Sequence, residues 1–357
     1  MLSRARSLLG LPGGPRDRLG PREIDRAARA VMALHDGLVG ARSLARPETY
    51  DERLHLGAYL LWWWPQSYAK VGAALRLLPA GLLQRGRILD LGAGPGPAAL
   101  AALDFLGEGE AVLVDASGAA LDEAKALADG EPLALRLWKL DAAALPLPAG
   151  ERYQLICAAN VLSELPGGPA ERAQLLQRIC DEHLAPRGTL LLVEPALRET
   201  GRALLEVRDL LLQRGLHASA PCLTQRPCPA LAFSKDWCTA EERWLPPPHV
   251  VQLAQATGLR ADQLLSFAPL ALSREAPPAV PDLFRVVGVA PPEKGKARVF
   301  VCNDEHGRAA AGLLDRDRSE SNAAITSLRR GDLVTLRGLA PKGDGLRLGK
   351  DSVVRKG

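Results

Sequence analysis

Hydrophobic residues recur at helical spacing in the first part of the chain. The pattern runs from about residue 20 to 45 and again from 55 to 83, where Pro65 divides it. Proline lacks a backbone donor and clashes with the preceding turn, so the second stretch is expected to form two helices. The chain therefore begins with a helical region, assigned to residues 1–80.

From residue 86 the pattern changes to short apolar runs that alternate with helical stretches. The runs lie at 86–92, 110–117, 133–141, 153–160 and 188–195. Strands that alternate with helices predict a parallel sheet covered by helices. Two later runs, 262–272 and 284–290, are expected to close this sheet as its last strands. We expect an α/β domain over residues 81–292.

Two further segments do not fit the alternation. Residues 217–248 are rich in proline and cysteine, which predicts an irregular insertion in the α/β domain. Residues 293–357 show short strand patterns separated by glycine turns. That texture is consistent with a small antiparallel β-barrel of the oligonucleotide-binding (OB) kind.

Composition indicates a globular protein of about two domains. The 357 residues are 47% hydrophobic and 24% charged. The apolar stretches end well before about 18 residues, so no membrane span is expected. The start of the chain lacks the pattern of a secretion signal, although its Arg-rich, acid-poor character would also suit an organelle transit peptide. We predict a cytoplasmic protein and no membrane association.

The charge is unevenly distributed. Residues 1–30 hold seven Arg against three acids, and residues 329–357 hold eight Lys or Arg against three acids, whereas the whole chain carries only +4. Two basic ends around an acidic middle favour a polyanionic partner, and Arg suits phosphate groups. The pattern therefore indicates contact with nucleic acid.

A glycine-rich loop between a strand and a helix is the first candidate site. Asp90 precedes Gly92, Gly94 and Gly96, and Asp115 ends the next predicted strand. Glycines allow close approach to a ligand, and a carboxylate at that strand end can hold ribose hydroxyls. A tight turn without a ligand is the plain alternative. A nicotinamide site is disfavoured because Pro97 stands where the third glycine of that fingerprint belongs.

Three cysteines in eighteen residues form the second candidate site. Cys222 and Cys228 follow prolines, and Cys238 lies ten residues later. A cytosine-C5 methylation nucleophile is disfavoured because neither Pro-Cys pair follows the expected strand. The gaps are also wide for zinc, while an iron–sulfur cluster tolerates them. A cluster needs a fourth thiolate, and Cys302, at a predicted strand end, is the best choice.

The other two cysteines are not expected to bind metal. Cys157 falls inside a predicted core strand, and Cys180 falls inside a predicted helix. Both are interpreted as small buried hydrophobic residues.

The spacing Asp-x-Gly-x-Gly-x-Gly resembles the first motif of the Rossmann-like class I methyltransferases that depend on S-adenosylmethionine (SAM). The resemblance implies that the loop with Asp90 packs against the methionyl part of SAM and that Asp115 binds the ribose. It also implies that Asp141 lies near the adenine and that Asn160 faces the methyl donor.

Taken together, the donor loop, the cysteine pattern, Cys302 and the basic C-terminal segment resemble the methyltransferase-like protein 17 family of small-ribosomal-subunit assembly factors. The stretch 50–71 before the loop also matches. This resemblance implies a [4Fe–4S] cluster on Cys222, Cys228, Cys238 and Cys302, and association with small-subunit ribosomal RNA and proteins. We expect a monomer in which the cluster ties the insertion to the barrel.

Whether the protein transfers methyl groups stays open at this point. The Asn/Asp-Pro-Pro-aromatic motif of base amino-methylation is missing, since "NVLSEL" begins at Asn160. Three possibilities remain: an active ribosomal RNA methyltransferase, a non-catalytic binding protein with a vestigial SAM pocket, and a zinc-containing RNA methyltransferase. No catalytic residue is assigned.

Overall fold

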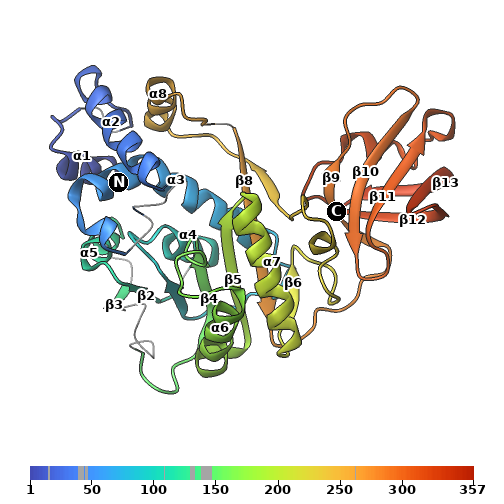
Figure 1. Ribbon diagram of the computed structural model, residues 1–357, viewed down its shortest axis with the longest axis horizontal. Helices are drawn as coiled ribbons and strands as arrows, with labels where there is room; N and C mark the ends of the chain where they lie inside the picture. The colour runs from blue at the N-terminus through green and yellow to red at the C-terminus, as the bar shows by residue number, and fades with distance from the viewer. Residues whose placement is uncertain are drawn as a thin grey trace. The chain divides into compact units, whose positions relative to one another are not determined.

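The computed structural model describes residues 1–14, 17–38, 44, 47–107, 109–128, 133–137, 147–261 and 263–357. The chain divides into two compact units (Figure 1). The first comprises residues 1–76, 80–193 and 242–265, and the second comprises 77–79, 194–241 and 266–357. In the described part of the chain, no helix is both long enough and apolar enough to cross a membrane.

Five parallel strands, part of a larger mixed sheet, form the centre of the first unit. They are β1 (Ile88–Leu91), β2 (Ala111–Asp115), β3 (Leu133–Leu137), β4 (Tyr153–Ala159) and β5 (Leu184–Pro195). Their order is β3-β2-β1-β4-β5, and each neighbouring pair is parallel. Figure 1 labels β2, β3, β4 and β5. This order is that of a Rossmann-type sheet, whose ligands bind where the order reverses, at the carboxyl ends of β1 and β4. The predicted α/β class is confirmed.

Helices cover both faces of this sheet. They are α4 (Pro97–Leu106), α5 (Gly118–Leu127) and α6 (Pro169–His183). Because crossovers between parallel strands are right-handed, α4 and α5 cover one face and α6 covers the other. Pro97 begins α4, where its missing N–H costs nothing.

The helical region at the start of the chain forms its own hydrophobic cluster. It contains α1 (Leu2–Leu9), α2 (Pro21–Leu38), a short 3₁₀ turn (Pro47–Asp51) and α3 (Arg53–Arg76). Buried residues of these helices pack with Val250 and Leu253 of α8 (Pro248–Thr257), a helix that comes much later in the sequence. The side chain of Gln252 adds hydrogen bonds to both the N–H and the C=O of Leu19.

The expected break at Pro65 is wrong. Helix α3 runs unbroken through Pro65, which is buried. The Gln66 side chain donates to the Trp62 carbonyl at 2.8 Å, so a side chain adds a hydrogen bond in the turn that the proline interrupts. Burial of the apolar faces on either side therefore outweighs the local cost of the proline.

The basic residues at the very start are used inside the unit. Arg4 forms an ion pair with Glu123, and Arg6 forms one with Glu23 at 2.7 Å. Leu2 and Leu9 of the same helix are buried in the helical cluster. Arg4 and Arg6 are therefore already paired with carboxylates, so these two cations of the basic N-terminal end are not available to a polyanionic partner.

The second unit begins with α7 (Arg198–Gln213) and the cysteine segment. Its strands β6 (His217–Ala220) and β8 (Leu264–Ser273) pair antiparallel. Between them lie a 3₁₀ turn (Pro229–Ala232) and the short strand β7 (Ala240–Arg243), and the rest of residues 221–239 is extended or bent. The predicted irregular structure of this segment is largely what the structure has.

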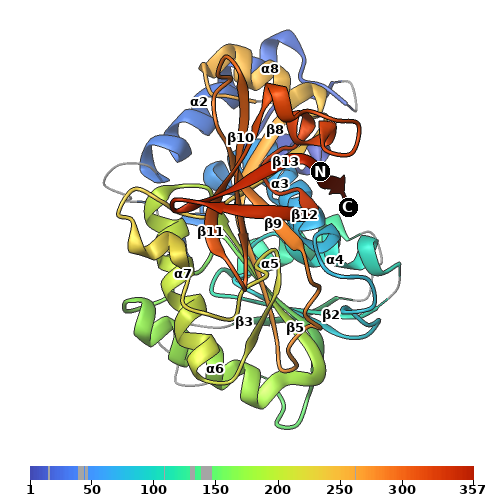
Figure 2. The same ribbon diagram turned by 90° about the vertical axis from the view of Figure 1, so that its right-hand side faces the viewer.

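A closed barrel completes the second unit (Figure 2). Its strands are β9 (Leu283–Val289), β10 (Lys296–Asn303), β11 (Gly307–Leu314), β12 (Leu333–Lys342) and β13 (Gly345–Lys356), in the order β10-β11-β13-β12-β9, with 3₁₀ turns at Asp315–Asp317 and Ala323–Ser327. Alternate residues such as Phe284, Val286, Val299 and Val301 fill its core.

Two sequence expectations for this region are wrong. The run 284–290 was expected to close the α/β sheet, but it forms β9 and pairs with β10 and β12 in the barrel. The barrel is also not wholly antiparallel, because β11 and β13 pair in parallel. The apolar alternation predicted a strand correctly, but alternation does not say which sheet a strand joins.

Candidate functional site

The glycine loop after β1 has the backbone geometry of a ligand-binding turn. Gly92, Gly94 and Gly96 have φ values of 63°, 51° and 75°, in the left-handed region. An added β-carbon at Gly92 would lie 2.3 Å from a methyl carbon of Val161. At Gly94 it would meet nothing within 4 Å. The loop therefore requires glycine, and Gly94 borders open space.

Asp115 lies at the end of β2, beside this loop. Its Oδ2 accepts a hydrogen bond from the Gly94 amide at 2.7 Å, and its Oδ1 accepts one from the Ser117 amide at 2.8 Å. Burial raises the pKa of the Asp115 carboxyl, and the amide donors oppose that rise. The carboxylate is thus fixed where the resemblance to SAM-dependent enzymes implies ribose binding.

Asp90 is fully buried at the strand end that leads into the loop. Its Oδ2 accepts from the Ala99 amide at 2.9 Å, whereas its Oδ1 has no hydrogen-bond partner among the described residues. Burial is the main reason that the pKa of Asp90 rises to about 8. An orphaned buried carboxyl oxygen calls for a donor, and the ammonium of a methionyl group would supply one. On this test the loop residues fit SAM.

Helix α3 borders the same loop. The Trp64 indole N–H donates to the Pro95 carbonyl at 3.0 Å. Asn160, after β4, has φ 60° and donates through Nδ2 to the Ser67 hydroxyl at 3.3 Å. Asn160 thus follows the carboxyl end of β4, and the Ser67 hydroxyl of α3 engages its side chain. Asp141 lies outside the described residues.

The four predicted cysteine ligands line a single cavity in the second unit. Cys222, Cys228, Cys238 and Cys302 all contribute to its wall, and its volume is about 260 Å³. No group of three or more His, Cys, Asp or Glu side chains in the described ranges is arranged to hold one metal ion. The four thiols therefore line the wall of the cavity and do not converge on the position of a single metal ion.

The thiols also influence one another electrostatically. Burial raises the pKa of Cys228 to about 11 and that of Cys238 to about 12, and neighbouring cysteines add to both shifts. The pKa of Cys302 is raised by burial and then by the other three thiols. Negative charge on a neighbouring sulfur therefore disfavours ionisation of Cys228, Cys238 and Cys302. A metal that binds here must displace protons.

Cys157 and Cys180 lie elsewhere, as predicted. Both are fully buried, in β4 and α6 of the first unit. Burial, followed by the neighbouring Asp90, raises the pKa of the Cys157 thiol well above its usual value. These two cysteines act as apolar core residues.

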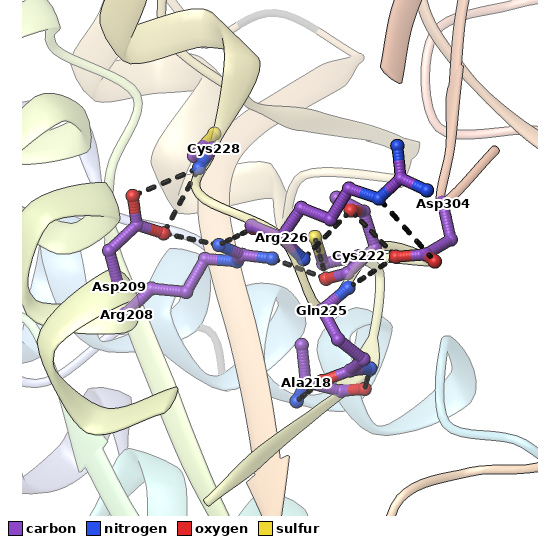
Figure 3. Close-up of polar contacts among 9 residues, drawn as sticks. Arg208, Asp209, Ala218, Cys222, Gln225, Arg226, Cys228 and Asp304 are labelled. Atoms are coloured by element: carbon purple, nitrogen blue, oxygen red, sulfur yellow. Dashed lines mark hydrogen bonds and ion pairs between the residues drawn. The ribbon is translucent and has the colours of Figure 1, made fainter. Parts of the chain in front are cut away.

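An Arg–Asp pair in α7 holds the loop between the first two cysteines (Figure 3). The Arg208 guanidinium is fully buried and donates to the carbonyls of Thr224 and Arg226. Asp209 pairs with Arg208 and accepts from the Cys228 amide at 2.9 Å. Charged hydrogen bonds from one helix therefore set the backbone on both sides of the loop.

The barrel unit holds the same segment by polar contacts from four residues. Asp304, two residues after Cys302, accepts from the Thr224 hydroxyl at 3.0 Å and the Gln225 amide at 2.8 Å. Figure 3 shows the contact with Gln225. The other contacts join Arg285 to the Pro221 carbonyl, Arg308 to Asp236, and Arg330 to the Thr239 hydroxyl. A cluster would thus not be the only tie between the insertion and the barrel.

Trp237 packs beside the cysteines, and Trp244 does not. Trp237 lines the cavity and contacts the small cluster of Leu205, Cys228 and Ala230. Its indole N–H donates to the Ala196 carbonyl at 3.2 Å. Trp244 belongs to the first unit, where it packs against the helical cluster. Of these two tryptophans, Trp237 is the one that lines the cysteine cavity.

Sequence reasoning missed the buried arginines of this site. Arg208 falls on the apolar face of α7, four residues after Leu204 and three before Leu211. An Arg at that spacing within a buried stripe is a usable signal, because charges are rarely buried unless paired. The sequence gives no comparable signal for Arg285. Its place beside Cys302 depends on the pairing of β9 with β10, which the sequence alone does not reveal.

A methyl group at Gly94 tests the donor pocket. Gly94→Ala places a β-carbon in open space next to Asp115, so affinity for SAM should fall at least tenfold, about 1.4 kcal/mol. The left-handed backbone should cost about 1–2 kcal/mol of stability. Gly107→Ala is the matched control, because Gly107 also has a positive φ with nothing within 4 Å but ends α4 away from the loop. Equal SAM affinities by calorimetry for both variants would contradict this site.

The raised pKa of Asp90 predicts a pH dependence of stability. The ordinary pKa of an aspartate is 3.8, and that of folded Asp90 is about 8. Between pH 3.8 and about pH 8, Asp90 therefore keeps a proton in the folded protein that it releases in the unfolded chain. Asp90 should therefore lower the free energy of unfolding as pH rises, by up to about 1.4 kcal/mol per pH unit. Asp90→Asn should flatten this slope in urea unfolding between pH 5 and 8 without SAM. Parallel slopes for variant and wild type would show that Asp90 ionises normally.

Solved structures of other proteins resemble this chain in part. Three solved methyltransferase structures are similar to the chain at low identity: a SAM-dependent methyltransferase of Leishmania major, the ribosomal protein L11 methylase of Lactobacillus delbrueckii and a TehB-like methyltransferase of Corynebacterium glutamicum. Their identities are 17%, 16% and 15%, and their TM-scores are 0.41, 0.35 and 0.35. The matches cover 73%, 59% and 58% of this chain and 100%, 79% and 88% of the others.

A search of curated proteins finds no match. The family model described as mitochondrial small ribosomal subunit Rsm22 matches residues 53–329, which span the glycine loop, all four cavity cysteines and most of the barrel. This match confirms the resemblance to small-subunit proteins found in the sequence. The chain belongs to the Rsm22 family, and membership implies association with the small ribosomal subunit.

Proposed function

We propose that this protein is an assembly factor of the small ribosomal subunit that binds SAM in its first unit and a [4Fe–4S] cluster in its second. The observation that carries the proposal is the convergence of Cys222, Cys228, Cys238 and Cys302 on one cavity of about 260 Å³. Membership of the Rsm22 family supports the ribosomal part. The protein is a methyltransferase-like member of that family.

The cavity favours a cluster over a single zinc ion. Zinc draws four ligands to within about 2.3 Å of one point. The described side chains contain no such group. A [4Fe–4S] cluster spreads its thiolates over four irons, which suits sulfurs placed around a space. When bound, it would supply a rigid inorganic cross-link between the insertion and β10.

Ribosomal RNA is the proposed partner of the barrel. Four of the eight cations in residues 329–357 form ion pairs, namely Arg330, Arg337, Arg347 and Lys356. The other four are exposed and have no carboxylate partner among the described residues: Arg329, Lys342, Lys350 and Arg355. Unpaired surface cations are available to phosphates. Arg4 and Arg6 add nothing to this surface.

In the donor site, we assign the methionyl ammonium to Asp90, the ribose to Asp115 and close contact to the glycines of the loop. The proposed role of this pocket is binding rather than methyl transfer, since "NVLSEL" replaces the amino-methylation motif. Methyl transfer to ribosomal RNA is the second candidate. Asn160 lies just after the carboxyl end of β4 and has a left-handed backbone, which favours methyl transfer.

Compartment, oligomeric state and domain limits are also part of the proposal. We propose a monomer in the cytoplasm, although the family is described as mitochondrial. The proposed domain limits are a helical region at 1–80, a methyltransferase-like domain from residue 81 with the insertion at 217–248, and an OB-like barrel that begins with β9 at Leu283 rather than at residue 293. Limited proteolysis and sedimentation would test the last two points.

Methylation is tested by mass mapping of small-subunit ribosomal RNA from a deletion strain. The binding role predicts that every modification persists in the deletion strain. A modification that is lost, and that is restored by wild-type protein but not by Asp115→Asn, would select the methyltransferase instead.

The cluster is tested by single cysteine substitutions. Cys228→Ser and Cys302→Ser should each remove most of the iron from anaerobically purified protein and weaken co-sedimentation with small subunits. Cys180→Ser is the control, because Cys180 is buried in α6 outside the cavity, and it should keep its iron. The proposal fails if the wild-type protein is colourless and iron-free. It also fails if both cavity variants keep full iron and full binding.

A further inference from the structure

Two arginines flank Cys302 on the barrel wall. Cys302 in β10 pairs in register with Arg285 of β9 on one side and with Arg308 of β11 on the other. All three side chains line the cysteine cavity. Arg285 is the more deeply buried, at 7% exposure, whereas the Arg308 side chain keeps 29%.

Most cations of this wall already have an anionic partner. Arg208 pairs with Asp209, Arg308 pairs with Asp236 at 2.8 Å, and Arg330 lies 3.8 Å from Glu241. These pairs offset the charge of each guanidinium within the protein itself.

Arg285 forms no ion pair with a carboxylate in the described part of the chain, and Asp332 acts on it electrostatically without direct contact. Its Nε donates to the Pro221 carbonyl at 3.0 Å and its Nη1 donates to the Gly331 carbonyl. Its Nη2 has no hydrogen-bond partner, and no carboxylate forms an ion pair with it, among the described residues. Asp332, which follows Gly331, pairs with Lys356 at 2.9 Å.

A buried cation held only by carbonyls is costly. Removing a guanidinium from water loses several kcal/mol, which a nearby anion must offset. Four thiolates carry more negative charge than a [4Fe–4S] core carries positive charge, so the assembled cluster is an anion in both of its common redox states. Arg285 lines the same cavity as the four cysteines, so the negative charge of a bound cluster would lie beside its guanidinium.

We propose that Arg285 is the counter-ion of the cluster and sets its reduction potential. This inference rests on the proposed [4Fe–4S] site. Arg285 is a positioning residue: it holds the backbone before Cys222 through the Pro221 carbonyl, and its charge stabilises the more negative, reduced cluster. Removing the charge should make the cluster harder to reduce.

The test is a redox titration with dithionite, followed by absorbance and electron paramagnetic resonance. Arg285→Gln can still donate to a carbonyl but carries no charge, so its midpoint potential should fall below that of the wild type. Arg285→Lys keeps the charge, so its potential should stay near the wild type. The control is Arg308→Gln combined with Asp236→Asn, which removes a neutral pair from the other side of Cys302 and should leave the potential unchanged.

The outcomes separate this inference from the proposed function. Iron-free wild-type protein defeats the cluster itself. A loaded Arg285→Gln protein with the wild-type potential overturns the counter-ion while the cluster stands, and so do equal potentials for the Gln and Lys variants. Failure of Arg285→Gln to fold, with or without iron, also overturns it, because the guanidinium would then serve the scaffold.

Discussion

The buried guanidinium of Arg208 is the interaction on which the cysteine site depends. It is fully buried in α7 and satisfies the carbonyls of Thr224 and Arg226, while its partner Asp209 holds the Cys228 amide. Taking away one member of such a buried pair typically costs about 3–5 kcal/mol. An extended, proline-rich loop has no ladder of its own, so these bonds fix where its two cysteines point. Asp304 then ties the same loop to the strand end that carries Cys302.

The two candidate sites use the same physical device in different forms. In the donor site a buried carboxyl, Asp90, has an oxygen without a partner. In the cysteine cavity a buried guanidinium, Arg285, has no ion pair with a carboxylate among the described residues. Each is an ionisable group buried in the protein interior, where the dielectric constant is low. A ligand of opposite charge would offset the desolvation cost of the charged form. An ammonium suits the first, and an anionic cluster suits the second.

Local pattern was enough to predict most of the helices and strands, and it selected candidate site residues that the fold places near one another. Periodicity predicted the five parallel strands, and motif spacing selected Gly92, Gly94, Asp115 and the four cysteines that share a cavity. Tertiary effects account for the misses. Tertiary packing keeps α3 helical through Pro65. Strand β9 joins the barrel, and the alternation of apolar residues in a strand does not show which strand it pairs with. Arg285 could not be found from sequence, since its role follows from register with Cys302 alone.

The most direct test of the central claim is X-ray diffraction at the iron absorption edge from crystals grown without oxygen. The account predicts anomalous iron density inside the cavity bounded by Cys222, Cys228, Cys238 and Cys302, with all four sulfurs bonded to it. A cavity without iron, closed by a disulfide or holding a lone zinc ion, would contradict it.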